Sequence, residues 1–343
     1  MQLEKNENQI MLFERIQKVL PSNIAMVDVL SDLLNVSSDA VYRRIRGAKP
    51  IDFEEAVLLC NHFKIPLDSF VNLNAKEQIQ CYYSPLDFSN LQNQVIHLQS
   101  LLADIDSIRL ETGSEMIISA ANVPEFNFFS YKELTTFILF SWSCSLFAFK
   151  GSFEKFADSM DFSKLSDCYE KIVKSYQLVP STEIWTTDTM DRLLTLLNHH
   201  YEMGHFGDEK FPLFLCEQIL DLIKTIQSWA EKGSKGKDDT PYKFYVSEID
   251  INNTFAMIKK ENVTKCFLKL FTLNGLSTTD ERFCREIENW LENTEQRATL
   301  ISGASEKERH RFFNSLIHKV KILNDKIYQS NLKNGLVSIK GSI

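Results

Sequence analysis

Residues 30–47 read Leu30-Ser-Asp-Leu-Leu-Asn-Val-Ser-Ser-Asp-Ala-Val-Tyr-Arg-Arg-Ile-Arg-Gly47, and this stretch predicts two helices joined by a tight turn. Apolar residues recur at helical spacing on both sides of Asn35. Asparagine tolerates the positive φ that such a turn requires. Ser37 is placed to cap the second helix, over residues 38–46, and Gly47 is placed to end it.

Helical patterns flank this pair on both sides. Pro21 breaks the chain between the first two patterns, and Asp52 and Glu55 have the spacing of a capping box before the fourth. The segments together predict one five-helix domain over residues 1–74. The helices are expected at residues 9–20, 24–34, 38–46, 53–63 and 67–71.

Residues 30–47 and their continuation to Phe70 resemble the helix-turn-helix of the Cro/C1-type (XRE-like) repressor family. The resemblance covers about a fifth of the chain. It departs from the family pattern at Asn35, where glycine is usual, and at Ser31, where alanine is common. It implies a DNA-binding domain whose helix 38–46 lies in the major groove. The matching apolar positions are Leu30, Leu34, Val36, Val41 and Ile45.

The helix over residues 38–46 carries polar and basic side chains on the face opposite Val41 and Ile45. Arg43 or Arg46 is suited to pair bidentately with guanine, whereas Arg44 and Lys49 are expected to contact phosphates. Ser22 and Asn23 begin the second helix, where free N–H groups bind phosphate. The alternative for residues 43–49 is a solvated charged face. The candidate DNA-binding residues are Ser22, Asn23, Ser37, Ser38, Asp39, Tyr42, Arg43, Arg44, Arg46 and Lys49.

Charge sets a limit on how tightly one copy of this domain can bind DNA. Residues 1–72 hold eight Lys and Arg against ten Asp and Glu, a net charge of −2 (8 − 10), in a chain of net charge −8. Counterion release supplies much of the affinity of proteins for DNA, so a single copy should bind weakly. We therefore expect a homodimer that occupies two half-sites.

The sequence after residue 74 predicts a large, helix-rich body. We therefore expect a mainly α fold, which is α+β when the predicted strands are included. A helical regulatory and dimerisation region is expected over 75–232 and an α+β region over 233–343, either separate or joined in one body. Residues 231–241 are expected to form an exposed loop or linker. Strands of a small antiparallel sheet are expected at residues 115–121, 242–246, 254–259, 264–272 and 336–339. Helices are expected at residues 91–110, 130–150, 153–175, 187–203 and 212–232, with two more opened by capping boxes at 278–281 and 305–308.

Two features of the body leave a choice between a functional and a structural interpretation. Nine phenylalanines lie between Phe126 and Phe156, and they form either an aromatic pocket for an apolar effector or ordinary core. The helix over residues 91–110 is either a dimer seam or a connector packed on its own domain. In both cases the structural interpretation is favoured.

Catalysis, cofactors and membrane insertion are not indicated. The candidate metal ligands are His199, His200 and His205, whose spacing equally suits surface histidines near a helix end. The longest uncharged stretch, residues 134–149, is sixteen residues long, short of a membrane span. No signal peptide is visible at the N-terminus. The seven cysteines include no CxxC pair, which favours free thiols in a reducing cytosol.

These observations predict a cytoplasmic, sequence-specific transcription regulator of the one-component type, a non-enzyme that binds double-stranded DNA as a homodimer. The body is expected to dimerise, with a small-molecule or peptide effector left open. The alternative is a regulatory interaction module whose helical body binds a peptide or protein partner.

Overall fold

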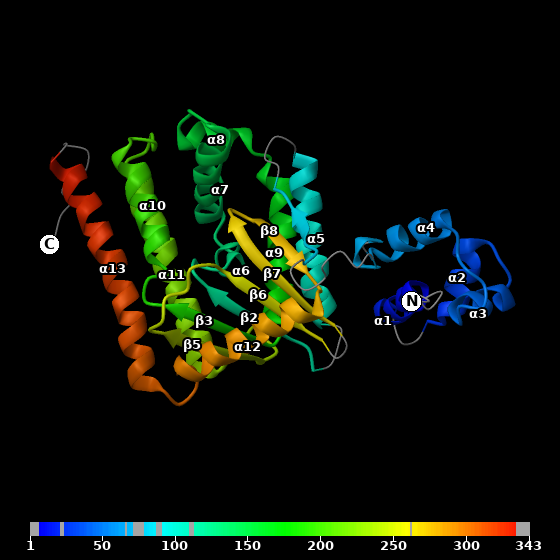
Figure 1. Cartoon of the computed structure of the whole chain (residues 1–343). Coiled ribbons are helices and arrows are strands. Elements are labelled where there is room, and N and C mark those ends of the chain that lie inside the picture. The colour runs from blue at the N-terminus through cyan, green and yellow to red at the C-terminus, as the bar shows by residue number, and fades with distance from the viewer. Residues whose placement is uncertain are drawn as a thin grey trace. The chain divides into compact units, whose positions relative to one another are not determined.

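The computed structural model describes residues 7–20, 24–65, 67–70, 79–86, 91–109, 113–260 and 263–333. The chain divides into two units, Met1–Cys81 and Tyr82–Ile343 (Figure 1).

Five helical segments make up the described part of the N-terminal unit. Asn35 has a φ of 50° in the turn after the second segment, and the Ser37 side chain accepts a hydrogen bond from Ala40 N. Asp52 and Glu55 form the expected capping box. These local predictions are confirmed. The segments are α1 (Glu7–Val19), α2 (Met26–Leu34), α3 (Ser38–Ile45), α4 (Phe53–Phe63) and a 3₁₀ helix (Leu67–Phe70).

The body contains a mixed sheet of nine strands within its described residues, so the predicted small antiparallel sheet is wrong. β2 pairs in parallel with β3, and β3 in parallel with β5, whereas the other pairings are antiparallel. The strand order is β1-β8-β7-β6-β2-β3-β5-β4, with β9 also paired to β5. The strands are β1 (Tyr82–Ser84), β2 (Glu115–Ala120), β3 (Ser181–Thr186), β4 (Ser234–Lys235), β5 (Thr240–Ser247), β6 (Phe255–Lys259), β7 (Thr264–Phe271), β8 (Asn274–Thr278) and β9 (Thr299–Leu300).

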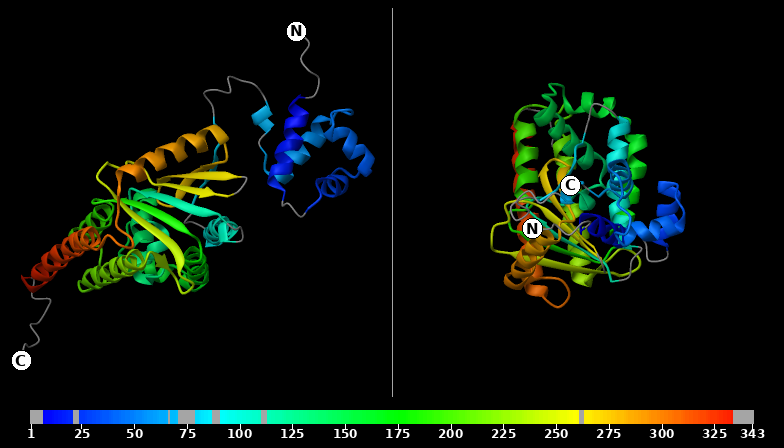
Figure 2. Two further views of the ribbon diagram at one scale, coloured as in Figure 1. Left: turned by 90° about the horizontal axis from the view of Figure 1, so that it is seen from below. Right: turned by 45° about the vertical axis from the view of Figure 1, so that its right-hand side comes forward.

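Helices cover both faces of this sheet. Successive strand residues point to opposite faces, so Ile118 and Trp185 enter a large core on one face while Ile117 and Ile184 enter a smaller one on the other. The helix α12 (Glu281–Arg297) covers the smaller core (Figure 2, left). The large core is built with α5 (Leu91–Arg109), α6 (Glu125–Phe128), α7 (Lys132–Phe147), α8 (Phe153–Ser159), α9 (Phe162–Gln177), α10 (Asp191–Glu202), α11 (Phe211–Lys232) and α13 (Glu306–Lys333).

The phenylalanine-rich stretch is core. Seven of the nine phenylalanines between Phe126 and Phe156 are buried, and Phe140 contacts the rings of Phe149, Phe153 and Phe156 at centroid distances of 5.7–6.1 Å. The structural interpretation is thereby confirmed. The packed rings of Phe140, Phe153 and Phe156 join α7 to α8.

Several sequence predictions for the body need correction. Residues 231–241 are not an exposed loop, because they hold the end of α11, β4 and the start of β5, and Lys235 is buried. The helix expected over 153–175 is two helices, α8 and α9. The first begins at a Ser152 cap. α7 begins at Lys132, two residues later than predicted, and no side chain caps its start. The edge strand expected at 336–339 lies outside the described residues.

Five strands of the described residues were not predicted: β1, β3, β4, β8 and β9. β3 is the most instructive, because all six of its residues are buried and one of them is Glu183. A carboxylate in the middle of a short run argues against a buried strand when only the sequence is read. Among the helices of the described residues, none is long and apolar enough to cross a membrane.

The packing of α12 on the sheet can be tested by truncating Leu291, which is 1% exposed in the smaller core. We expect Leu291→Ala to lower the free energy of unfolding of the body by about 2–4 kcal/mol, because it leaves a cavity. The four tryptophans all lie in the body, so urea unfolding followed by tryptophan fluorescence reports on this unit. The exposed neighbour Glu292 provides the control, since Glu292→Ala should change stability by less than about 0.5 kcal/mol.

Candidate nucleic-acid interface

The helix α3 presents one polar face to solvent. Val41 is fully buried on the opposite face and packs in the core of the N-terminal unit. Tyr42 is 50% exposed at the centre of the outer face. Spacings of one, four and five residues place these side chains on one side of a helix. The exposed side chains of this outer face are Ser38, Asp39, Tyr42, Arg43 and Arg46.

The turn before α3 leaves the N-terminal residues of the helix, Ser37 and Ser38, exposed to solvent. Asn35 takes the left-handed conformation, and Val36 N donates to Ser31 O at 3.1 Å. Ser37 Oγ accepts from Ala40 N at 3.4 Å, so its lone pair satisfies one of the free N–H groups at the helix start. The Ser37 side chain is exposed, which leaves its hydroxyl proton available to an outside acceptor such as a phosphate.

Gln9 of α1 fixes the loop that follows α3. Its Nε2 donates to the carbonyl oxygens of Arg44 (2.7 Å) and Lys49 (2.9 Å), and its Oε1 accepts from Ile51 N at 2.9 Å. The Lys49 backbone N–H also donates to Arg43 O at 3.0 Å. Lys49 is therefore an exposed side chain on a fixed backbone. This role of Gln9 was not predicted, although Gln9 is a polar residue on the buried face of α1.

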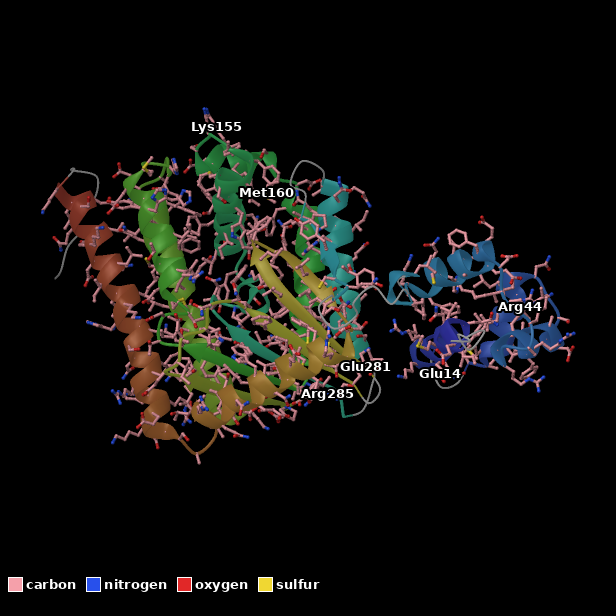
Figure 3. The ribbon with its side chains drawn as sticks, viewed as in Figure 1. Glu14, Arg44, Lys155, Met160, Glu281 and Arg285 are labelled. Atoms are coloured by element: carbon pink, nitrogen blue, oxygen red, sulfur yellow. The ribbon has the colours of Figure 1, made fainter. Side chains whose placement is uncertain are left out.

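Arg44 is not a phosphate contact, contrary to the sequence prediction. It is 4% exposed, and its guanidinium forms a bidentate ion pair with Glu55 of α4, with Nη2–Oε1 at 2.6 Å and Nε–Oε2 at 3.2 Å. Its Nη1 also donates to Ala40 O at 3.4 Å. Two consecutive arginines on a short helix must face different directions, and Arg44 is the one that faces inward (labelled in Figure 3).

The exposed cations differ in how firmly they are held. Arg46 Nε donates to Tyr42 O at 3.3 Å on its own helix, which directs its guanidinium along the outer face. Arg43 and Lys49 are exposed side chains on either side of it in sequence. A guanidinium offers several N–H donors in a planar fork, which suits guanine edges and phosphate oxygens. Ser22 and Asn23, the other candidate phosphate ligands, lie outside the described residues.

Two of the three histidines proposed as metal ligands, His200 and His205, are hydrogen-bonded to each other. His200 Nδ1 lies 2.8 Å from His205 Nδ1, and His200 Nε2 lies 2.9 Å from Ser141 Oγ. Both ring nitrogens of His200 are thus engaged, while His199 is exposed. Within the described ranges, no group of three or more His, Cys, Asp or Glu is arranged to hold a metal ion. Burial lowers the pKa of His200 to about 4, and the charges of His205 and His199 act in the same direction.

Comparison of the chain with protein-family models, with curated proteins and with solved structures finds no match.

Replacing Arg44 should lower the stability of the N-terminal unit without changing the exposed side chains on the outer face of α3. We expect Arg44→Met to lower local stability by about 2–3 kcal/mol, because it leaves the Glu55 carboxylate without its partner. Hydrogen exchange of the α3 and α4 amides in the full chain measures this. Arg43→Met removes the same charge from an exposed position and should leave exchange almost unchanged. Equal exchange in the two variants would contradict the assigned role of Arg44.

The depressed pKa of His200 predicts acid sensitivity of the body. Unfolded histidine takes up a proton near pH 6.5, whereas folded His200 does so only near pH 4. Its contribution to stability is therefore complete above about pH 6.5 and is lost as the pH falls toward about 4.

His200→Gln should reduce the loss of stability between pH 7 and pH 4.5 by about 2 kcal/mol, measured by urea unfolding with tryptophan fluorescence. His318→Gln changes an exposed histidine of the body and should keep the wild-type pH dependence. An unchanged pH dependence in His200→Gln would show that another group titrates in this range.

Proposed function

We propose that this protein is a cytoplasmic, sequence-specific DNA-binding transcription regulator of the one-component type. The observation that carries the proposal is the outer face of α3, where Tyr42, Arg43 and Arg46 are exposed while Val41 and Arg44 anchor the opposite face. An eight-residue helix is about 12 Å long, comparable to the width of the major groove. The preceding tight turn and the capped N-terminus of α3 are features of a helix-turn-helix reader.

The roles of the side chains follow from their chemistry and position. Arg43 and Arg46 are assigned to guanine edges, because each offers a bidentate fork on the outer face. Tyr42 and Ser38 can donate hydroxyl protons to bases or to the backbone. Lys49 has its backbone held by Gln9 beside the helix, so its ammonium is assigned to a phosphate.

The small number of exposed cations supports binding as a homodimer. Arg44 is neutralised by Glu55, which leaves Arg43, Arg46 and Lys49 as the cations beside α3. Three contacts release few counterions, so a second copy on a second half-site is needed for useful occupancy. We assign dimerisation to the body and expect half-sites one helical turn apart, about 34 Å between centres.

The proposal can be tested by selecting preferred sites from random duplexes with the full-length protein in a mobility-shift assay. Arg43→Ala and Arg46→Ala should relax the sequence preference at defined positions, each by about 1–3 kcal/mol. Lys49→Ala should weaken binding to all duplexes and reduce the slope of affinity against salt by about one.

Lys237→Ala is the matched control, since it removes one exposed charge from the body and should leave preference and salt slope unchanged. Retained sequence preference in both arginine variants would refute the assigned contacts. Absence of any preferred duplex for the wild-type dimer would refute the proposed function itself.

A further inference from the structure

The large core of the body contains a carboxylate and an amine that are both sealed from solvent. Glu183 of β3 is 0% exposed and Lys235 of β4 is 1% exposed. Removing either charge from water is costly unless partners replace the lost hydration. The surroundings of the two groups therefore show what chemistry this part of the core accommodates.

Glu183 is surrounded by donors from three elements. Tyr176 Oη of α9 donates to Oε1, and Trp185 Nε1 donates to Oε2 at 2.7 Å. Asn127 Nδ2 of α6 donates to Oε2 at 3.2 Å. The side-chain oxygen of Asn127, Oδ1, is buried and has no hydrogen-bond partner among the described residues. The site thus holds a carboxylate in a fixed position and keeps a spare acceptor beside it.

The amine of Lys235 lies in a cage of aromatic faces and oxygen atoms. Its Nζ is 3.2 Å from the centroid of the Tyr176 ring and 5.6 Å from that of Tyr242, and it donates to Ser181 Oγ at 2.5 Å. Phe126 stacks on Tyr176 at 4.8 Å and holds that ring in place. Aromatic faces near a carboxylate are the usual recognition elements for ammonium groups. Burial lowers the pKa of Lys235, and the charge of Glu183 opposes this shift.

The amine reaches the cage from a strand with little support of its own. β4 has two residues, which pair with Pro241 and Thr240, and its Ser234 Oγ donates to Asp239 Oδ1 at 3.2 Å. It is flanked by Gly233 and Gly236, which have φ values of 69° and 72°. A surface pocket of about 300 Å³ adjoins it, lined by Lys224, Thr225, Ser228, Trp229, Lys232, Ser234 and Gly236. The insertion of Lys235 is thus a major attachment of β4 to the rest of the body.

We propose that Tyr176, Ser181, Glu183 and Tyr242 form a binding site for a primary alkylammonium group, which Lys235 occupies from within the chain. By filling this site, the Lys235 side chain fixes the edge strand β4 to the sheet. A methionine or leucine would satisfy an ordinary core position at lower desolvation cost. The cage and the carboxylate select instead for a charged amine on an alkyl chain.

Chemical rescue provides the test. Lys235→Ala in the full-length protein removes three carbons and the amine beyond Cβ, which is the size of n-propylammonium. We expect n-propylammonium to raise the melting temperature of Lys235→Ala in a saturable manner, with a dissociation constant in the millimolar range, and to have little effect on the wild type. 1-Propanol has the same shape without the charge and should not reproduce the rescue.

The double variant Lys235→Ala with Glu183→Gln should lose the response to n-propylammonium, because its cage lacks the anion. Rescue of Lys235→Ala by 1-propanol to the same extent would overturn the proposal, since filling a cavity would then suffice. A well-folded Lys235→Ala that does not respond to n-propylammonium would overturn it as well.

A second measurement decides the question if Lys235→Ala does not fold. Glu183→Gln keeps Lys235 and the shape of the site, but it removes the buried negative charge that favours the ammonium form of Lys235. We expect at least tenfold faster hydrogen exchange at the Tyr242 amide, which donates to Gly233 O beside β4. Asp238→Asn makes the same chemical change at an exposed position of this hairpin and should leave that exchange unchanged. If the Tyr242 amide exchanges at the wild-type rate in Glu183→Gln, the proposed attachment of β4 by Lys235 is refuted.

Discussion

The bidentate ion pair between Arg44 and Glu55 determines which face of α3 meets solvent. An eight-residue helix has few side chains with which to anchor itself, and only Val41 and Arg44 of α3 are buried. An apolar contact alone would tolerate some rotation of the helix, whereas two parallel N–H···O bonds are directional. Because Arg44 is held by α4, its neighbour Arg43 must face outward.

Gln9 extends this control to the loop after α3. One side chain on α1 binds the carbonyl oxygens of Arg44 and Lys49 and the N–H of Ile51. The position of Lys49 relative to Arg46 is therefore held by hydrogen bonds. A DNA-reading surface needs such support, because hydrogen bonds to base edges depend on precise placement of their donors. Buried polar residues of α1, α3 and α4 thus support the exposed residues that we propose contact DNA.

The body uses buried polar chemistry in a different way. Apolar residues pack on both faces of its sheet, and β3 lies between β2 and β5, the two strands that pair with it in parallel. Two charged residues are buried among these apolar side chains: Glu183 of β3 and Lys235 of the edge strand β4. Inward-pointing charge also discourages an edge strand from pairing with another chain. The cost of burying the pair is offset by aromatic faces and hydroxyl groups from other elements.

Local patterns in the sequence determined much of the N-terminal unit. Apolar spacing, the turn at Asn35 and the caps at Ser37 and Asp52 are interactions between residues a few positions apart, so the sequence alone predicts them. The outward face of Tyr42, Arg43 and Arg46 followed from the same spacing. Only the tertiary structure decided that Arg44 turns inward, because its partner Glu55 lies on another helix. The mixed sheet and the burial of Lys235 were likewise decided by long-range pairing, which brings together strands that carry no local sign of their neighbours.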